Sequence, residues 1–309
     1  MRRDPLSRLH TLLESGELRL VHVIGVARSN STLVCRLLGQ QLDGAVYEPA
    51  VPSSIDPATN FARVILRAYS RARRTRPVPI VLAVKDISLF LTETQMALIA
   101  RHAAHVVFTI RDPASAHASL VRQLQHEFNF WQRVDATVRQ PFESLWMFIS
   151  FLHSLPKFAN FARTALPGIK MGLYRAGMAG WSLISWDRLM AQFAAIDPTR
   201  ITVLDAAEMR RQPEAAAAEL GRIARRLMPA GRQPMIELAA HTRMAPRSKW
   251  AAEARASAFI KPAASAVAPA SEPLIRAIAA RADPAYRALL DSAANPLRIT
   301  PVRAAAAAA

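Results

Sequence analysis

The chain has 309 residues, which is enough for one large α/β domain or two small ones. Hydrophobic residues make up 51% of it, and this composition excludes a globally disordered protein. The formal net charge of +17 favours anionic partners, but no basic run is interleaved with aromatic residues, so we expect no nucleic-acid partner. The densest arginine group is interpreted as a solvated helix end; it comprises Arg71, Arg73, Arg74 and Arg76.

The first 13 residues contain arginines but no long apolar core, which argues against a signal peptide. No window reaches the roughly 18 uninterrupted apolar residues of a membrane span. The single cysteine, Cys35, excludes an internal disulfide and a cysteine metal site, and we expect it to be a packed core thiol. The sequence therefore favours a soluble cytoplasmic protein.

The first predicted element is a buried strand rich in β-branched residues, at 20–26. A turn of small residues follows at 25–31, and a helical pattern begins at Thr32. A strand, a tight turn and a helix in this order direct backbone N–H groups and the positive helix end at one point. Such a point is suited to bind an anion.

Strand-like and helix-like segments then alternate along the chain. We predict strands at 45–47, 80–84, 105–110 and 201–204, and we expect Lys85 and Asp86 to end the second of these. The helices are predicted at 59–74, 89–102, much of 141–195 and after Pro213. This alternation indicates an α/β fold with a parallel sheet covered on both faces. The stretch 262–271 is expected to be a loose loop, and 304–309 a disordered tail.

The turn after the first strand is comparable with the mononucleotide P-loop, GxxxxGK[ST]. Asn30 occupies the second glycine position, and asparagine tolerates the left-handed conformation well. Ser31 replaces the lysine that reaches the β- and γ-phosphates of ATP, while a cation is present three residues earlier as Arg28. The turn is thus predicted to hold a phosphate, but not as an ordinary ATPase does.

The letters ARSNST at 27–32, followed by LVCRLL and then YEP at 47–49, resemble the PRSGST loop region of sulfotransferases. These enzymes use 3′-phosphoadenosine 5′-phosphosulfate (PAPS) as the sulfuryl donor. Two positions depart from that pattern, Ala27 for proline and Asn30 for glycine. The resemblance implies that the 5′-phosphosulfate is held by five consecutive residues: Arg28, Ser29, Asn30, Ser31 and Thr32.

A second motif, VVFTIRDPASAHASL, places Arg111 at a strand end and Ser119 eight positions later on the next helix. In sulfotransferases an arginine and a serine at this spacing bind the 3′-phosphate of PAPS. The guanidinium offers a planar fork to phosphate oxygens, and the hydroxyl adds a neutral donor. The alternative is that Arg111 pairs with a carboxylate such as Asp112 and that Ser119 faces solvent. Asp112 is expected to cap the helix that Pro113 begins.

Sulfuryl transfer needs a base for the acceptor hydroxyl and cations for the transferring group. Glu48 matches a glutamate that looks like the general base in the carbohydrate and tyrosylprotein branches of the family, and Lys85 resembles a family lysine that contacts the transferring group. The residue-level alternatives are a surface or capping carboxylate and a solvated strand-end lysine. Arg28 is the third candidate catalytic residue.

Several histidines compete for the role of the base. His102 and His105 flank a strand entry and are expected at the surface, whereas His117 is placed where it can approach the nucleotide. For these residues and for His126, a histidine satisfied by its neighbours is the favoured interpretation. Trp250 lies in RSKW, which resembles the late loop that closes over PAPS in some relatives; its alternative is a packed aromatic.

The sequence as a whole predicts a single P-loop-type three-layer domain over 1–309, with a core at about 18–250 and a helical acceptor-binding insertion at about 141–195. The resemblance implies a sulfotransferase that moves a sulfuryl group from PAPS, without a metal, to the hydroxyl of an acceptor. A glycan, lipid, peptide or secondary metabolite fits, and the positive charge favours an anionic one. The alternatives are a small-molecule kinase on the same fold and a non-catalytic nucleotide-binding module. Nothing in the sequence indicates the oligomeric state.

Overall fold

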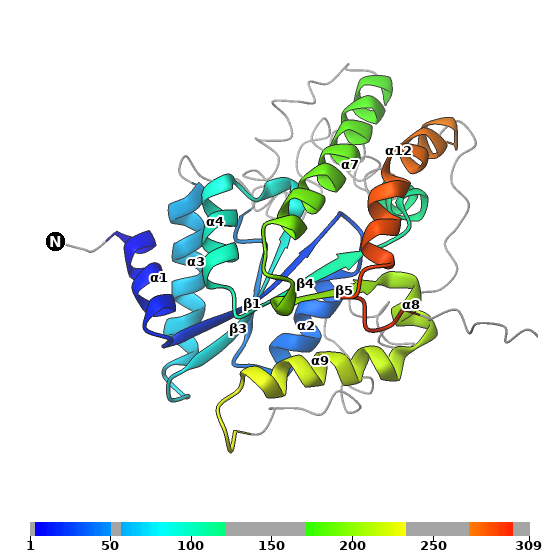
Figure 1. The fold of residues 1–309 in the computed structure, drawn as a ribbon. Helices are drawn as coiled ribbons and strands as arrows, with labels where there is room; N and C mark the ends of the chain where they lie inside the picture. Colours follow the sequence, from blue (N-terminus) through cyan, green and yellow to red (C-terminus); the bar gives the residue numbers. More distant parts are fainter. Residues whose placement is uncertain (1–3, 51–56, 121–170, 233–271, 299–309) are drawn as a thin grey trace, which may run out of the picture.

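The computed structural model describes residues 4–50, 57–120, 171–232 and 272–298, and these form an α/β fold around one five-stranded sheet (Figure 1). All strand pairs are parallel, and the strand order is β2-β3-β1-β4-β5. The strands are β1 (Leu18–Gly25), β2 (Ala45–Tyr47), β3 (Ile80–Ile87), β4 (His105–Ile110) and β5 (Ile201–Asp205). The predicted parallel sheet flanked by helices is confirmed.

Helices connect the strands, as parallel pairing requires. Within the described residues, the α-helices are α1 (Pro5–Glu14), α2 (Ser31–Gln41), α3 (Pro57–Ala72), α4 (Glu93–His102), α7 (Met171–Ala194), α8 (Ala206–Arg211), α9 (Pro213–Leu227) and α12 (Glu272–Leu290). Two short 3₁₀ turns, η1 (Ser88–Phe90) and η2 (Pro198–Arg200), precede α4 and β5. Residues 113–120 are also helical.

Side chains of the central strand β1 alternate between two cores, one on each face of the sheet. Leu20 and Ile24 pack with α1, α3, α4, α7 and α12. Val21 and Val23 pack on the other face, which α2, α8 and α9 cover (Figure 1). Because both faces of the strand are buried, it reads as a nearly continuous apolar run. The sheet thus lies between two layers of helices, and the fold has three layers.

The order of the strands creates a switch point between β1 and β4. The chain leaves the carboxyl end of β1 towards the edge formed by β2, and it leaves the carboxyl end of β4 towards the other edge, formed by β5. In open parallel sheets, ligands bind outside the carboxyl ends of two such neighbouring strands. The turn at 25–31 and Arg111 both lie at this place.

The third strand differs from the prediction, because Lys85 and Asp86 lie inside β3 and do not end it. Parallel pairing with β1 continues to Gly25 opposite Ile87, and the two polar side chains are satisfied by neighbours described below. The helix expected from residue 89 begins at Glu93, after η1. Thr92 sets that start through a capping box with Gln95.

The other predicted strands are confirmed, with β5 one residue longer than expected. Helices α1 and α12, and the short helix α8 before Pro213, are not predicted by the sequence. Helix α12 buries Leu289 in the core, and Tyr286 Oη donates a hydrogen bond to Asp205 Oδ2 over 3.2 Å, so the core extends past residue 250. Most of the predicted insertion (141–170), the loop at 262–271 and the tail at 304–309 lie outside the described residues.

Among the helices that the structure describes, none combines the length and the apolar character needed to cross a membrane.

Candidate functional site

The loop after β1 is wound so tightly that its first residue has no room for a side chain. A Cβ on Gly25 would lie 2.2 Å from Thr109 Oγ1 and 2.4 Å from Ser29 Oγ. These two hydroxyls hydrogen-bond to one another over 2.8 Å, and Ser29 Oγ lies 2.8 Å from the carbonyl oxygen of Val26. Arg28 then takes a left-handed conformation with φ of 69°. The hydrogen bond between Ser29 and Thr109 thus holds the loop against β4.

Helix α2 begins directly at the end of this loop, and Asn30 is its N-cap residue. Asn30 is left-handed, with φ of 69°, and its side chain makes no capping hydrogen bond. The first N–H groups of a helix have no partner within the helix, and here the cap side chain does not supply one. Ser31 is buried and Thr32 is exposed in this first turn. The end of α2 therefore offers backbone donors and a positive dipole to an anion.

Two arginines and a serine converge beside that helix end. Arg28 Nε donates a hydrogen bond to Ser119 Oγ over 3.1 Å, and Arg111 Nη1 donates to the backbone oxygen of Arg28 over 3.4 Å. Asp112 caps the helix at 113–120, as expected, by accepting from the backbone N–H of Ser115 over 2.8 Å. The structure thus brings together the two motifs that lie more than 80 residues apart in the sequence.

A lysine and a glutamate form the second charged part of the site. Lys85 lies on β3 with only 3% of its side chain exposed, and its Nζ donates to Oε1 of Glu48, which follows β2. The alternative of a solvated lysine at the strand end is therefore wrong. Glu48 is 40% exposed and has a left-handed backbone, with φ of 50°. Cys35 on α2 lies near this pair as a fully buried thiol, and burial raises its pKa.

A buried contact between a histidine and an aspartate, which the sequence does not predict, supports the segment after Glu48. Asp86 Oδ2 lies 2.9 Å from His22 Nε2, and Asp86 Oδ1 accepts from the backbone N–H of Ala50 over 2.9 Å. Both side chains are almost fully buried, and the His22 ring stacks on Phe61 with 6.0 Å between centroids. A signal is present in the sequence, because His22 and Asp86 are polar residues within largely apolar strands.

The expectation of a surface position is wrong for His105, which is 1% exposed. Its Nδ1 accepts from Arg226 over 2.7 Å, so its Nε2 carries the proton and donates to Thr202 Oγ1 over 2.9 Å. Burial, followed by the nearby Arg226 and Arg222, lowers the pKa of His105 to about 4. The residue is buried because β4 is an inner strand. His102 is half-buried, while His126 and Trp250 lie outside the described residues.

His117 lines a cavity of about 100 Å³ next to the loop. Its Nδ1 lies 2.8 Å from Ser182 Oγ, and its Nε2 is buried without a hydrogen-bond partner among the described residues. Burial lowers the pKa of this histidine, so the neutral imidazole is favoured. The rest of the lining is largely apolar: Val26, Ala27, Ile87, Leu89, Phe90, Pro113, Ala116, Leu120, Ser182, Ser185 and Trp186.

No family model, no curated protein and no solved structure matches this chain. The site consists of a helix N-terminus that receives no hydrogen bond from its cap side chain, two arginines beside it, a buried lysine paired with a glutamate, and a largely apolar cavity. Among the described residues, no group of three metal-ligating side chains gathers at this place.

Proposed function

We propose that the protein is a P-loop-type sulfotransferase, which transfers a sulfuryl group from PAPS to a hydroxyl of an acceptor molecule. The observation that carries this proposal is the contact of the Arg28 guanidinium with Ser119, together with Arg111 beside the same loop. PAPS carries anionic groups on both its 3′ and 5′ positions. Arginines placed next to a helix end match such a molecule, because each of them binds phosphate oxygens well.

The loop and the first turn of α2 would hold the 5′-phosphosulfate. Arg28, Ser29, Asn30, Ser31 and Thr32 bring the backbone N–H groups and hydroxyls for this role. Arg111 and Ser119 would hold the 3′-phosphate, and the Arg28–Ser119 contact would open to admit it. The serine at position 31, where ATP-binding loops have lysine, supports a donor other than ATP.

The transfer itself would use the pair formed by Glu48 and Lys85. The acceptor oxygen attacks sulfur and forms a new S–O bond, while the bond from sulfur to the bridging phosphate oxygen breaks. The electron pair of that bond stays on the phosphate, which leaves as adenosine 3′,5′-bisphosphate. Glu48 takes the hydroxyl proton, and Lys85 stabilises the charge that develops on the transferring group. The half-exposed position of Glu48 makes it accessible to an acceptor.

The cavity beside His117 supports a position for part of the acceptor. It opens between the loop and the helices that follow β4, and its lining is mostly apolar. An apolar portion of the acceptor would pack there and leave its hydroxyl towards the loop. We also propose a cytoplasmic location, where PAPS and a reduced Cys35 are compatible.

The test of catalysis uses PAPS carrying radioactive sulfur and a panel of hydroxyl compounds that includes glycans, lipids, tyrosine peptides and a lysate from the native host. We expect label to move to an acceptor with the wild-type protein. Retention of the label on PAPS with every acceptor would contradict the proposed activity.

Binding measurements separate this proposal from the kinase and from the non-catalytic module. At a hundredfold excess over its dissociation constant, adenosine 3′,5′-bisphosphate should stabilise the protein by about 2.7 kcal/mol. ATP with Mg²⁺ at the same concentration should stabilise it much less. The reverse order would support the kinase. Strong bisphosphate binding without transfer to any acceptor would support the non-catalytic module.

A further inference from the structure

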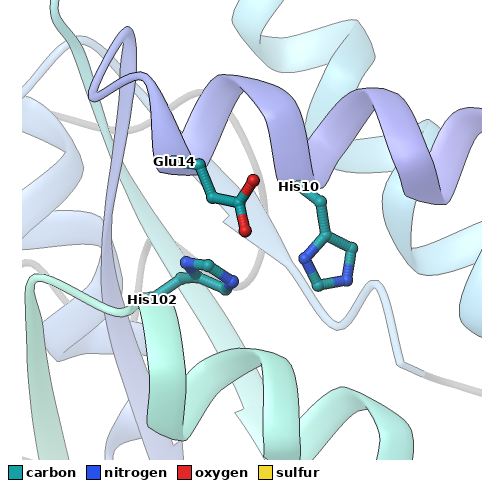
Figure 2. A group of neighbouring side chains, drawn as sticks. All are labelled: His10, Glu14 and His102. Carbon is teal, nitrogen blue, oxygen red and sulfur yellow. The ribbon is translucent and has the colours of Figure 1, made fainter.

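Three side chains with metal-binding atoms meet at the end of the sheet opposite to the loop (Figure 2). His10 and Glu14 lie four residues apart on α1, so they share one face of that helix. His102 is the last residue of α4 and faces them. The two helices lead into the amino ends of β1 and β4, whereas the proposed PAPS site lies at the carboxyl ends.

The geometry of the three side chains is close to that of a ligand set. One nitrogen of each histidine and one oxygen of Glu14 all lie within 4.8 Å of one another. The two imidazole rings meet edge to face, with 5.2 Å between their centroids. Ligand atoms around tetrahedral Zn²⁺ lie about 2.0–2.2 Å from the metal. Small side-chain rotations of the half-buried His10 and the exposed Glu14 would bring all three ligand atoms to this distance from one ion.

His102 provides a second, independent observation. Its Nε2 is buried and has no hydrogen-bond partner among the described residues. A buried polar atom without a partner is unfavourable, and each such atom in a folded protein calls for a physical reason. A metal ion held between α1 and α4 would satisfy this nitrogen.

One neighbouring cation competes for the carboxylate. Arg101 Nη2 donates to Glu14 Oε1 over 3.2 Å. The side chain of Arg101 is 70% exposed and that of Glu14 is 52% exposed, so this surface ion pair is weak. The contact uses a single oxygen, and an ionised carboxylate offers about four lone-pair positions. Arg101 therefore does not prevent Glu14 from binding a metal.

We propose that His10, Glu14 and His102 bind a divalent first-row transition metal, best matched by Zn²⁺, which joins α1 to α4. Two imidazole nitrogens and one carboxylate oxygen are ligands typical of Zn²⁺, whereas Mg²⁺ and Ca²⁺ prefer oxygen ligands alone. Three protein ligands leave one tetrahedral position for water. Since this position is far from the loop along the strands, the ion acts as a structural link and takes no part in sulfuryl transfer.

Thermal unfolding of the full chain, without an affinity tag and after treatment with a chelator, tests this proposal. We expect ZnCl₂ at a hundredfold excess over its dissociation constant to raise the midpoint by about 4 °C, and MgCl₂ to leave it unchanged. Co²⁺ as a substitute should give the visible absorption of a four-coordinate site. A midpoint that does not respond to ZnCl₂ would overturn the proposal.

Variants locate the site. Glu14→Gln and His102→Ala should each remove the Zn²⁺-dependent shift and weaken Zn²⁺ binding by about tenfold or more. Glu14 is exposed, so Glu14→Gln keeps the fold even if His102→Ala loses it. The matched control is Glu93→Gln, at the other end of α4, which should retain the full shift. A shift of equal size in Glu14→Gln and in the control would show adventitious binding elsewhere and would contradict the site.

Discussion

Arg28 Nε donates a hydrogen bond to Ser119 Oγ over 3.1 Å, although 91 positions separate the two residues in the chain. The contact joins the loop after β1 to the helix after β4 across the switch point of the sheet. Arg111 approaches the same loop from the end of β4. Two motifs that were recognised separately in the sequence therefore form one site, and this proximity is what the proposed PAPS binding requires.

Replacement of Ser119 tests the hydroxyl in this contact. Ser119→Ala should weaken the binding of adenosine 3′,5′-bisphosphate by about 10–150-fold, because a hydrogen bond to a charged phosphate contributes roughly 1.5–3 kcal/mol. Isothermal titration calorimetry measures this change. Ser70→Ala, on the exposed side of α3, is the control and should bind like the wild type. Unchanged affinity in Ser119→Ala would exclude this serine from the phosphate site.

The loop depends on the absence of a side chain at position 25. Gly25→Ala should destabilise the protein by about 1–3 kcal/mol, since the added Cβ collides with Thr109 Oγ1 and Ser29 Oγ. The variant should also lose bisphosphate binding. Urea unfolding and calorimetry measure these two effects.

Gly16→Ala is the comparison for this prediction. Gly16 has φ of 73° and nothing within 4 Å of the position of a Cβ. Gly16→Ala should lower the free energy of unfolding only by about 1 kcal/mol, the penalty for an alanine with a left-handed backbone, and should retain bisphosphate binding. Equal binding by the two alanine variants would mean that the close approach at Gly25 does not shape the nucleotide site.

Glu48 is predicted to act in the transfer and not in donor binding. Glu48→Gln should lower turnover by roughly 10²–10⁴-fold, because it removes the base, while the affinity for adenosine 3′,5′-bisphosphate stays the same. The amide oxygen can still accept from Lys85, so the fold should persist. Glu214→Gln, on the exposed first turn of α9, should transfer sulfuryl groups like the wild type. Full turnover in Glu48→Gln would exclude Glu48 as the base.

His105 should make the stability depend on pH. Its pKa is about 4 in the folded protein and 6.5 in the reference state, so the unfolded chain takes up the proton first as the pH falls. The contribution of His105 to the free energy of unfolding is on the order of 3 kcal/mol; it is fully present above pH 6.5 and is lost towards pH 4.

His105→Gln checks this prediction, because glutamine does not titrate. Urea unfolding between pH 4 and 6.5 should show a shallower loss of stability in the variant than in the wild type. The comparison is needed because burial also lowers the pKa of His117. Parallel pH dependences in the two proteins would contradict the role of His105.

The sheet could be predicted from the sequence because its strands are short apolar runs between turn signals. The β1 strand, the loop and α2 follow from local patterns, and so does the cap by Asp112. Local patterns do not show the end of β3, because Asp86 is buried by a partner 64 positions away, His22. Strand ends depend on such tertiary contacts.

The sequence predicts the residues that are proposed for the site, but it does not predict their contacts. A periodic pattern cannot show that Lys85 turns to Glu48, or that His105 lies under α9 beside Arg226. Helix α12 was also missed, since Pro284 inside it interrupts the helical pattern, and packing against α7 and β5 holds it in place. Each of these features depends on side chains from distant segments.

The central claim is that the protein binds the 3′-phosphate and the 5′-end of one nucleotide together. The direct measurement is calorimetry with adenosine 3′,5′-bisphosphate and adenosine 5′-monophosphate, on the wild type, Arg111→Gln and the surface control Arg67→Gln. The wild type and the control should prefer the bisphosphate by about 10–100-fold, and Arg111→Gln should lose this preference while it binds the monophosphate as before. If Arg111→Gln keeps the full preference, or if the wild type has none, the two motifs do not form a PAPS site.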